Sequence, residues 1–469
     1  MGGDSDRFLG VDIGLTFTRA TVINANGLIL GSAEERHASP AGGVVDPDTI
    51  WLEETRRTAR RVLQATSSSR IAGICICGPW PSMVALDEDG RCMLPAILLD
   101  DARFDGELEE VRAALPDPAV GYELLPRLLW LKRHLGDQWS AISLVLSSQN
   151  FVVYRLTGRN VVDIQTAKAY GCYDAETGGW DQGQLALLGL QDWPLPAVHR
   201  PLDTAGFLDE REARSWGLDG STPVIVGTGD TFASLVAAGA TDPGDDFLYC
   251  GTFGLCASLL QDIDTILDGS RTDNGHGLMW RLSLPNFGVH LDSLSALLLG
   301  RRPVDSADYA YVEREVAAVR PENVRPQYRF NYRDLSVPPS LRFNPVAVFD
   351  SIPMHFVGAD LVVAALKTFC LESAAAFRPE DRLASFGRPI KAAGGGSRNA
   401  VWMQLLADTS GRQVRAPRLS GAQGPARLAC AALGGRDLRF DDASDSEQFA
   451  VFDPDLAKFE RYAEQSGGR

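Results

Sequence analysis

The 469-residue chain has no apolar run that approaches the ~20 residues of a transmembrane helix. Its longest apolar stretches, such as Ala296–Leu299 and Leu361–Leu366, are far shorter. The N-terminus is acidic and lacks the basic and apolar regions of a signal peptide. These absences predict a cytoplasmic protein with no membrane partner.

Metal-ligand and disulfide patterns are also missing. The eight cysteines include no CxxC pair, and the six histidines are dispersed, which favours core packing in a reducing compartment. Positive charge is scarce, since 45 Lys and Arg against 61 Asp and Glu give a net charge of −16. This balance argues against a nucleic-acid partner. It permits a small anionic ligand, because a local group of backbone amides can bind an anion.

Three familiar catalytic signatures do not occur, namely the GxxxxGK[ST] loop, the GxGxxG fingerprint and the GxSxG elbow. What is present is ordinary globular composition, with 45% hydrophobic and 23% charged residues. At ~150 residues per domain, the length predicts two or three domains.

Strand patterns alternate with helix patterns, which predicts an α/β fold. We expect strands at Phe8–Ile13, Arg19–Ile23, Ile71–Cys77 and Ala96–Leu99, and a helix at Asp48–Leu63 capped by Asp48. The strand–turn–strand layout of the chain's start recurs from Asp245, with strands expected at Phe247–Cys250 and Leu255–Leu260. We therefore expect two α/β domains of related design, residues 1–242 and 243–469.

The remaining segments give weaker patterns. Residues 301–356 are expected to form an irregular connection with a short helix near Tyr309–Val319. A helix capped by Asp360 is expected through Leu361–Phe377, and a helix of small residues at Gly424–Leu433. The last thirty or so residues are polar and acidic and are expected to form a solvated end.

The turn after the first strand carries Asp12, Gly14, Thr16, Thr18 and Arg19. Its backbone amides and glycine favour a phosphate, the hydroxyls and the guanidinium add donors, and the carboxylate is a hard ligand for Mg²⁺. The alternative is an ordinary hairpin with solvated polar residues.

A second candidate is Asp230, which follows the apolar run Pro223–Val226 and two glycines, with Thr231 beside it. A carboxylate at the end of a buried strand can accept the proton of a substrate hydroxyl that attacks phosphorus. The alternative is an aspartate that satisfies turn amides. Trp80, between two prolines, is either a rigid wall of a sugar site or a core residue.

Two glycine turns complete the candidate site. Gly251 and Thr252 form the turn that matches the first one, and the two turns would hold a nucleotide between them. The run Gly394, Gly395, Gly396, Ser397, Arg398, Asn399 precedes a helix start and can bind an anion. The alternative in each case is a flexible turn.

These segments, in this order, resemble the FGGY carbohydrate kinase family, most closely its xylulokinase-like branch. The family's first substrate segment is matched by Ile71–Gly78 through Pro95–Arg103. A further family segment is matched by Tyr154–Gly158, with Asp163 and Gly179–Asp181. The adenosine segment is matched by Gly394–Asp408, and the helix behind it by Gly424–Leu433. The resemblance covers roughly residues 8–270 and 358–435.

The resemblance implies two actin-like, ribonuclease-H-type domains with ATP and Mg²⁺ in the cleft, and phosphorylation of a sugar or polyol hydroxyl. It makes Asp230 the catalytic base and places Asp12 near Mg²⁺ and the phosphates, so both are expected at the metal. The phosphate turns and the nucleotide segment are matched by Thr16, Arg19, Gly251, Thr252, Gly395, Gly396, Asn399 and Gln404. A homodimer is also expected from the family.

The acceptor side departs from the family pattern. Trp80-Pro81 replaces Met-His, and Leu99-Asp100 replaces Trp-Asn, while Asp101 and Arg103 match. The family's Gly-Glu-Arg segment is not recognisable in residues 280–356. We therefore expect an ATP-dependent kinase with a rebuilt acceptor pocket. The rival is a non-catalytic nucleotide-binding sensor, and an actin-like ATPase is a third alternative.

Overall fold

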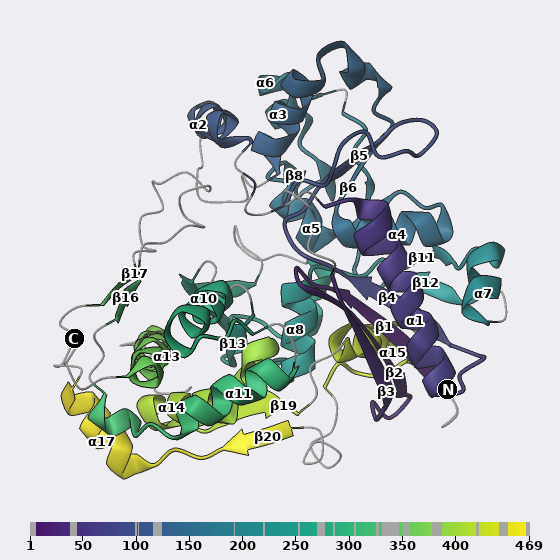
Figure 1. Ribbon diagram of the computed structural model, residues 1–469. Helices are drawn as coiled ribbons and strands as arrows, with labels where there is room; N and C mark the ends of the chain where they lie inside the picture. Colours follow the sequence, from purple (N-terminus) through teal and green to yellow (C-terminus); the bar gives the residue numbers. More distant parts are fainter. Residues whose placement is uncertain are drawn as a thin grey trace.

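Two mixed six-stranded sheets form the framework of the computed structural model (Figure 1). The structure describes residues 6–37, 45–98, 101, 103–115, 124–191, 193–218, 221–251, 254–269, 277–284, 287–303, 306–324, 328–330, 347–349, 357–377, 387–418, 422–439 and 449–465. The first sheet contains, in spatial order, β11 (Thr204–Phe207), β12 (Pro223–Ile225), β4 (Gly73–Cys77), β1 (Arg7–Ile13), β2 (Phe17–Asn24) and β3 (Ile29–Arg36). The second contains β15 (Leu278–Leu284), β14 (Gly254–Leu259), β13 (Asp246–Cys250), β18 (Ile390–Ala393), β19 (Val414–Pro417) and β20 (Phe449–Phe452).

The two sheets share one pattern of strand directions. In the first, β1, β2 and β3 are antiparallel in turn, β4 and β12 run parallel to β1, and β11 is an antiparallel edge. In the second, β13, β14 and β15 repeat the antiparallel part, β18 and β19 the parallel part, and β20 the edge. The α/β fold with a repeated layout, which the sequence predicted, is confirmed.

Helices cover both sheets. Those that precede the second sheet in the chain are α1 (Glu54–Ala65), α2 (Asp105–Ala114), α3 (Leu125–Leu135), α4 (Ser148–Thr157), α5 (Ile164–Ala169), α6 (Gln182–Leu187), α7 (Glu210–Trp216) and α8 (Asp230–Ala238). Those that come after the first two strands of the second sheet are α9 (Ile263–Asp268), α10 (Phe287–Leu299), α11 (Ser306–Ala317), α13 (Gly358–Ala376), α14 (Ala400–Ser410), α15 (Gln423–Gly434) and α17 (Leu456–Gln465). None of the helices in the described residues is both long and apolar enough to cross a bilayer.

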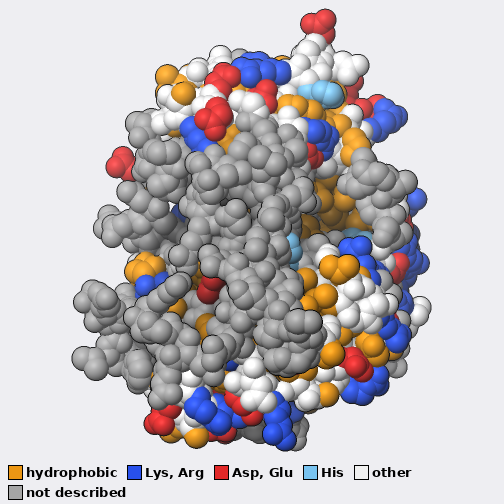
Figure 2. Space-filling view, turned by 60° about the vertical axis from the view of Figure 1, so that its left-hand side comes forward, with side chains coloured by type: hydrophobic (Ala, Val, Ile, Leu, Met, Phe, Trp, Pro, Cys, Tyr) orange, Lys and Arg blue, Asp and Glu red, His pale blue; other side chains and the backbone are white. Residues whose placement is uncertain are grey.

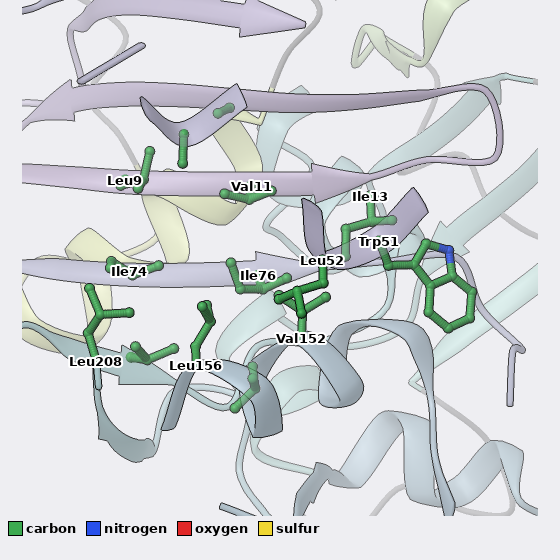
Figure 3. Close-up of a cluster of buried hydrophobic side chains, with 14 of the residues drawn as sticks. Leu9, Val11, Ile13, Trp51, Leu52, Ile74, Ile76, Val152, Leu156 and Leu208 are labelled. Atoms are coloured by element: carbon green, nitrogen blue, oxygen red, sulfur yellow. The ribbon is translucent and has the colours of Figure 1, made fainter. Parts of the chain in front are cut away.

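The first core lies on one face of the first sheet (Figure 3). Alternation along β1 directs Leu9, Val11 and Ile13 to this face. Neighbouring β4 adds apolar side chains, and α4 and the turn before α1 cover them, through Ile74, Ile76, Trp51, Leu52, Val152 and Leu156. Burial of each such aliphatic side chain stabilises the fold by roughly 1.5–3 kcal/mol.

Helices α8 and α15 form the joint between the sheets. Although α15 comes late in the chain, it packs on β1 and β4 of the first sheet and against α8. A Cβ atom on Gly10 would lie 2.1 Å from Ala426 N, and one on Gly424 would lie 2.0 Å from Ala233 O. Helix α8 in turn contacts β13, β18 and β19 of the second sheet. The two sheets are therefore joined by backbone-to-backbone packing that requires glycine.

Two local expectations near the first sheet are wrong. The helix at Asp48 starts as predicted, but the Asp48 side chain does not cap it; Asp46 Oδ1 accepts the Asp48 N–H at 3.1 Å, and Asp48 pairs with Arg155 at 3.0 Å. The described part of the predicted strand at residues 96–99 forms only a bridge, between Ile97 and Met83.

The chain end is not the solvated end that its composition suggested. Strand β20 pairs antiparallel with β19, and α17 packs against α14 with Tyr462 fully buried. The spaced aromatic residues of this segment supply an apolar face, which its acidic average composition did not indicate. Two other expectations are confirmed: α11 matches the short helix predicted near residue 309, and Asp360 accepts the Val357 N–H at 2.8 Å at the start of α13.

Candidate active site

The carboxyl ends of β1, β4 and β12 meet at one edge of the first sheet, because these strands are parallel. In open α/β sheets, ligands bind at this edge. The loop after β12 is joined to the end of β4 through a bridge between Gly78 and Gly229, and the Asp230 N–H donates to Gly78 O at 2.9 Å. The structure thus places Asp230, at the first turn of α8, beside the end of β1 that carries Asp12.

The loop that precedes Asp230 is held from two sides. Gly227 has φ +74°, and a Cβ there would lie 2.1 Å from Ile76 O, so the loop lies directly on β4. Thr228 Oγ1 donates to Asp163 Oδ1 at 2.9 Å, and this buried carboxylate also accepts the N–H groups of Gln165 and Thr166 at the start of α5. Asp163 therefore fixes the loop that carries the candidate base.

Thr228→Val is expected to lower kcat about tenfold and to cost about 1–2 kcal/mol of stability, because it removes one buried hydrogen bond and leaves Asp163 with fewer donors. Steady-state kinetics and thermal unfolding measure the two effects. Thr58→Val is the matched control, since the buried Thr58 hydroxyl has no hydrogen-bond partner in the structure. Equal activity of both variants would show that the loop needs no anchor.

Asp12 and Asp230 form a pair of carboxylates with raised pKa values. Burial, and then the negative charge of Asp12, raise the pKa of Asp230 to about 7, against hydrogen bonds from Thr231. Burial raises the pKa of Asp12 to about 6, against the charge of Arg19, whose Nη1 lies 3.9 Å from Asp12 Oδ2. A pKa near neutrality suits a group that accepts a proton during catalysis.

The structure places Gly14 and Thr16 in the first turn and Arg19 beside Asp12, but it directs Thr18 away from them. The turn is closed by the Gly14 N–H, which donates to Phe17 O at 2.9 Å, and Thr16 lies partly exposed in it. Arg19 pairs across the strands with Asp12. Thr18 is buried, and its hydroxyl donates to Glu54 of α1 at 3.4 Å. Neighbouring strand residues point to opposite faces, so Thr18 faces away from the group that Arg19 and Asp12 form.

The glycine turns of the second sheet also lie side by side, because β13 and β18 are parallel neighbours. Gly394 has φ +96°, and a Cβ there would lie 2.6 Å from the Cys250 carbonyl carbon, next to Gly251. Gly395 is exposed, with open space around its Cα, which leaves its backbone accessible to a ligand. Thr252 lies outside the described residues.

Other predicted nucleotide residues have side chains that bond within the protein. Ser397 Oγ donates to Gly394 O at 2.8 Å, and Asn399 Oδ1 caps α14 by accepting the Trp402 N–H at 2.9 Å. A Cβ on Gly396 would meet the Trp402 ring. Gln404 Nε2 donates to Asp408 Oδ1 and Asp453 O, both at 2.8 Å. Ser397 and Asn399 therefore shape the turn, whereas the Gln404 side chain bonds to residues outside it.

On the acceptor side, Trp80 lies next to the base loop, since a Cβ on Gly229 would be 3.1 Å from Trp80 Cβ. Its ring contacts Phe232 edge-on, with centroids 6.2 Å apart. Thr231 Oγ1 donates to Asp230 Oδ1 at 3.3 Å. Trp80 is therefore a wall beside Asp230 as well as a packing residue.

Asp101 and Arg103 form a separate pair, in which Arg103 Nε donates to Asp101 Oδ1 at 2.8 Å. The Arg103 guanidinium lies over the Trp130 ring, 5.0 Å from its centroid. Asp100 lies outside the described residues. The sequence did not predict Trp130 as a neighbour of the acceptor side, because an aromatic residue in a helix with many leucines usually packs in a core.

The molecule is hollowed between its upper and lower parts on the face in Figure 2, and hydrophobic side chains line the hollow. A separate cavity of about 680 Å³ lies against the start of the first helix, lined by residues that include Asp48, Cys92 and Arg155. The predicted catalytic residues do not line this cavity.

Comparisons with known proteins agree with this geometry. The model of the FGGY family of carbohydrate kinases matches its N-terminal domain to residues 7–237 and its C-terminal domain to residues 344–433. Xylulose kinase from Escherichia coli (strain K12) is 25% identical over 487 residues, 98% of this chain and 99% of that protein. Autoinducer-2 kinase from Salmonella typhimurium is 25% identical over 471 residues, 91% of this chain and 85% of its own.

Solved structures show the same fold. Xylulose kinase from Rhodospirillum rubrum aligns with a TM-score of 0.74 and 25% identity, over 98% of this chain and 96% of its own. Glycerol kinase from Plasmodium falciparum with ADP has a TM-score of 0.72 at 15% identity, over 99% of this chain and 97% of its own. The chain therefore belongs to the FGGY family of carbohydrate kinases and is an ATP-dependent kinase of that family.

Proposed function

We propose that this kinase transfers the γ-phosphoryl group of ATP to a hydroxyl of a small sugar or polyol, of ketose or pentulose type, with Asp230 as general base. The observation that carries the proposal is the Asp12–Asp230 pair, where burial holds the pKa of Asp230 at about 7. Relatives named xylulose kinase support an acceptor of this size.

In the proposed step, Asp230 accepts the proton of the acceptor hydroxyl as that oxygen attacks the γ-phosphorus. The new P–O bond forms while the bond between the γ-phosphorus and the β,γ-bridging oxygen breaks, and ADP leaves with the electron pair. Trp80 and Thr231 limit the space beside the base, and the hydrogen bond from Thr231 fixes its orientation.

Mg²⁺ fits the donor set. Asp12 and Asp230 supply hard oxygen ligands, and the raised pKa values of these two partly buried carboxylates indicate that they lack a full counter-charge. No cluster of three or more His, Cys, Asp or Glu side chains capable of holding a metal occurs among the described residues. That suits an ion bound by one or two carboxylates plus phosphate oxygens and water. When bound, Mg²⁺ neutralises charge on the phosphates; Asp12 and Asp230 would hold it.

The positions of two arginines support the proposal that ATP binds between the sheets. Burial, and then the charge of Arg19 on β2, lower the pKa of Arg398, which follows the glycine turn of the second sheet. Two guanidinium groups, one from the first sheet and one from the glycine turn of the second, repel each other in this way and are suited to bind a polyphosphate between them. We propose that residues 1–242 hold the acceptor and residues 243–469 hold ATP. The homodimer stays a prediction.

The pH profile tests the base. Because the folded pKa of Asp230 is raised to about 7, the required ionised form is lost as pH falls through 7. We expect kcat/KM to be level above pH 8 and to fall about tenfold per pH unit below 7. A profile that stays level from pH 8 to 5.5 would contradict the assignment.

The same profile in Asp12→Asn provides a further check. The Asp12 charge raises the pKa of Asp230, so its removal lowers that pKa and moves the acidic limb of the residual activity to lower pH. A limb that stays in place or moves upward would show that the two carboxylates are not coupled.

The decisive experiment measures ADP release with Mg-ATP across a panel of ketoses, aldoses, polyols and cyclitols. We expect a strong rise with one class of acceptor. ATP binding without a rise for any acceptor would support the nucleotide-binding sensor instead.

A further inference from the structure

Tyr249 comes from the second sheet but points toward the joint with the first. It lies one residue before the end of β13, on the same face as Phe247. Phe247 is buried in a cluster with Phe232 and Ala233 of α8, and Tyr249 packs against this cluster. Because α8 begins with Asp230, the Tyr249 side chain lies on the face of the second sheet that meets the proposed base.

The phenol ring also lies against the glycine turn. A Cβ on Gly251 would be 2.6 Å from Tyr249 Cε1 and 2.7 Å from both Cζ and Oη. Only glycine leaves room for the ring at this position. The hydroxyl therefore lies where the second sheet's proposed phosphate turn begins.

Asp230 at the start of α8, Asp12 on β1 and Arg19 on β2 all act electrostatically on this one hydroxyl. Burial raises the pKa of the Tyr249 phenol, the charges of Asp230 and Asp12 raise it further, and the charge of Arg19 lowers it. A tyrosine phenol is neutral at physiological pH and can donate a hydrogen bond. The base, its partner carboxylate and the cation of the first turn all lie near Tyr249.

We infer that Tyr249 is a further catalytic residue, whose hydroxyl donates a hydrogen bond to the phosphoryl group as it passes from ATP to the acceptor. The inference rests on the proposed function. Phosphoryl transfer spreads negative charge over the equatorial oxygens, and a donor whose ring is already packed needs no reorganisation to stabilise it. The donor lies on β13 of the second sheet and the base lies at the start of α8, so their relative position depends on the joint between the sheets.

The test is Tyr249→Phe, which keeps the ring and its packing on Gly251. We expect kcat to fall about 10²-fold, with the KM for ATP within about threefold of wild type and an unchanged melting temperature. Tyr462→Phe is the matched control, because it removes a buried hydroxyl without a hydrogen-bond partner in a different core cluster. Its kcat is expected to equal that of wild type.

Two results would overturn the inference. One is a kcat for Tyr249→Phe within twofold of wild type in an enzyme that Asp230→Asn inactivates, which leaves the proposed function intact. The other is a loss of kcat together with a lower melting temperature and a raised KM for ATP, which indicates a structural role. Retained activity in Asp230→Asn is a separate result that contradicts the proposed base itself.

Discussion

Asp230→Asn is expected to lower kcat by about 10²–10⁴-fold, the usual contribution of a general base. The amide has the same shape as the carboxylate and accepts the Thr231 hydrogen bond, but it cannot take the proton of the acceptor hydroxyl. ATP binding, measured by calorimetry without acceptor, is expected to remain. ADP release with the acceptor from the panel measures kcat.

The same substitution is expected to leave the protein as stable as wild type or more stable at pH 8. The folded pKa of Asp230 is raised, so its contribution to stability is present at low pH and is lost as pH rises through about 7. A neutral amide removes this loss. Thermal unfolding at pH 5 and pH 8 checks the sign.

Asp89→Asn is the control for both measurements, since Asp89 is an exposed aspartate paired with Arg91. It is expected to change neither kcat nor the melting temperature. Near wild-type turnover in Asp230→Asn would refute the base. Lost turnover with a melting temperature well below that of the control would mean that the residue serves the fold.

The placement of the candidate site was predictable where its residues lie at or after the ends of strands. Asp12, Gly251 and Gly394 lie at or directly after the end of an apolar strand, Asp230 follows one by a short glycine loop, and parallel strands bring such ends together. From the sequence, Thr18 is assigned to the same turn, because the second strand is expected to begin only at Arg19. The strand begins at residue 17, and alternation then decides which side chains face the site.

Side-chain direction outside strands was not predictable in this way. Gln404 lies in the nucleotide segment, yet its amide donates to Asp408 one helical turn later and to the Asp453 carbonyl directly after β20. Its role depends on a strand that was itself missed. Tyr249 was overlooked for the opposite reason, because a tyrosine in a strand is typical of a core.

The sequence also did not predict which distant segments of the chain pack against each other. The helix of small residues at 424–433 was predicted and is confirmed as α15, but its position on the first sheet was not. Small residues indicate close approach without naming the partner. The partner is Gly10 of β1, more than 400 positions away, whose Cα faces the α15 backbone.

Gly10→Ala is therefore expected to destabilise the protein by about 3 kcal/mol or more, because its Cβ would lie 2.1 Å from Ala426 N and backbone cannot rotate away. The urea midpoint of unfolding measures the loss. Gly106→Ala is the matched control: it lies in α2 with nothing within 4 Å of its Cβ and is expected to stabilise by up to about 1 kcal/mol. An unchanged midpoint in Gly10→Ala would show that α15 does not pack on β1. A lowered midpoint accompanied by lower kcat in the remaining folded enzyme would show that the joint also aligns the base with the nucleotide turns, since α8 and α15 form it together.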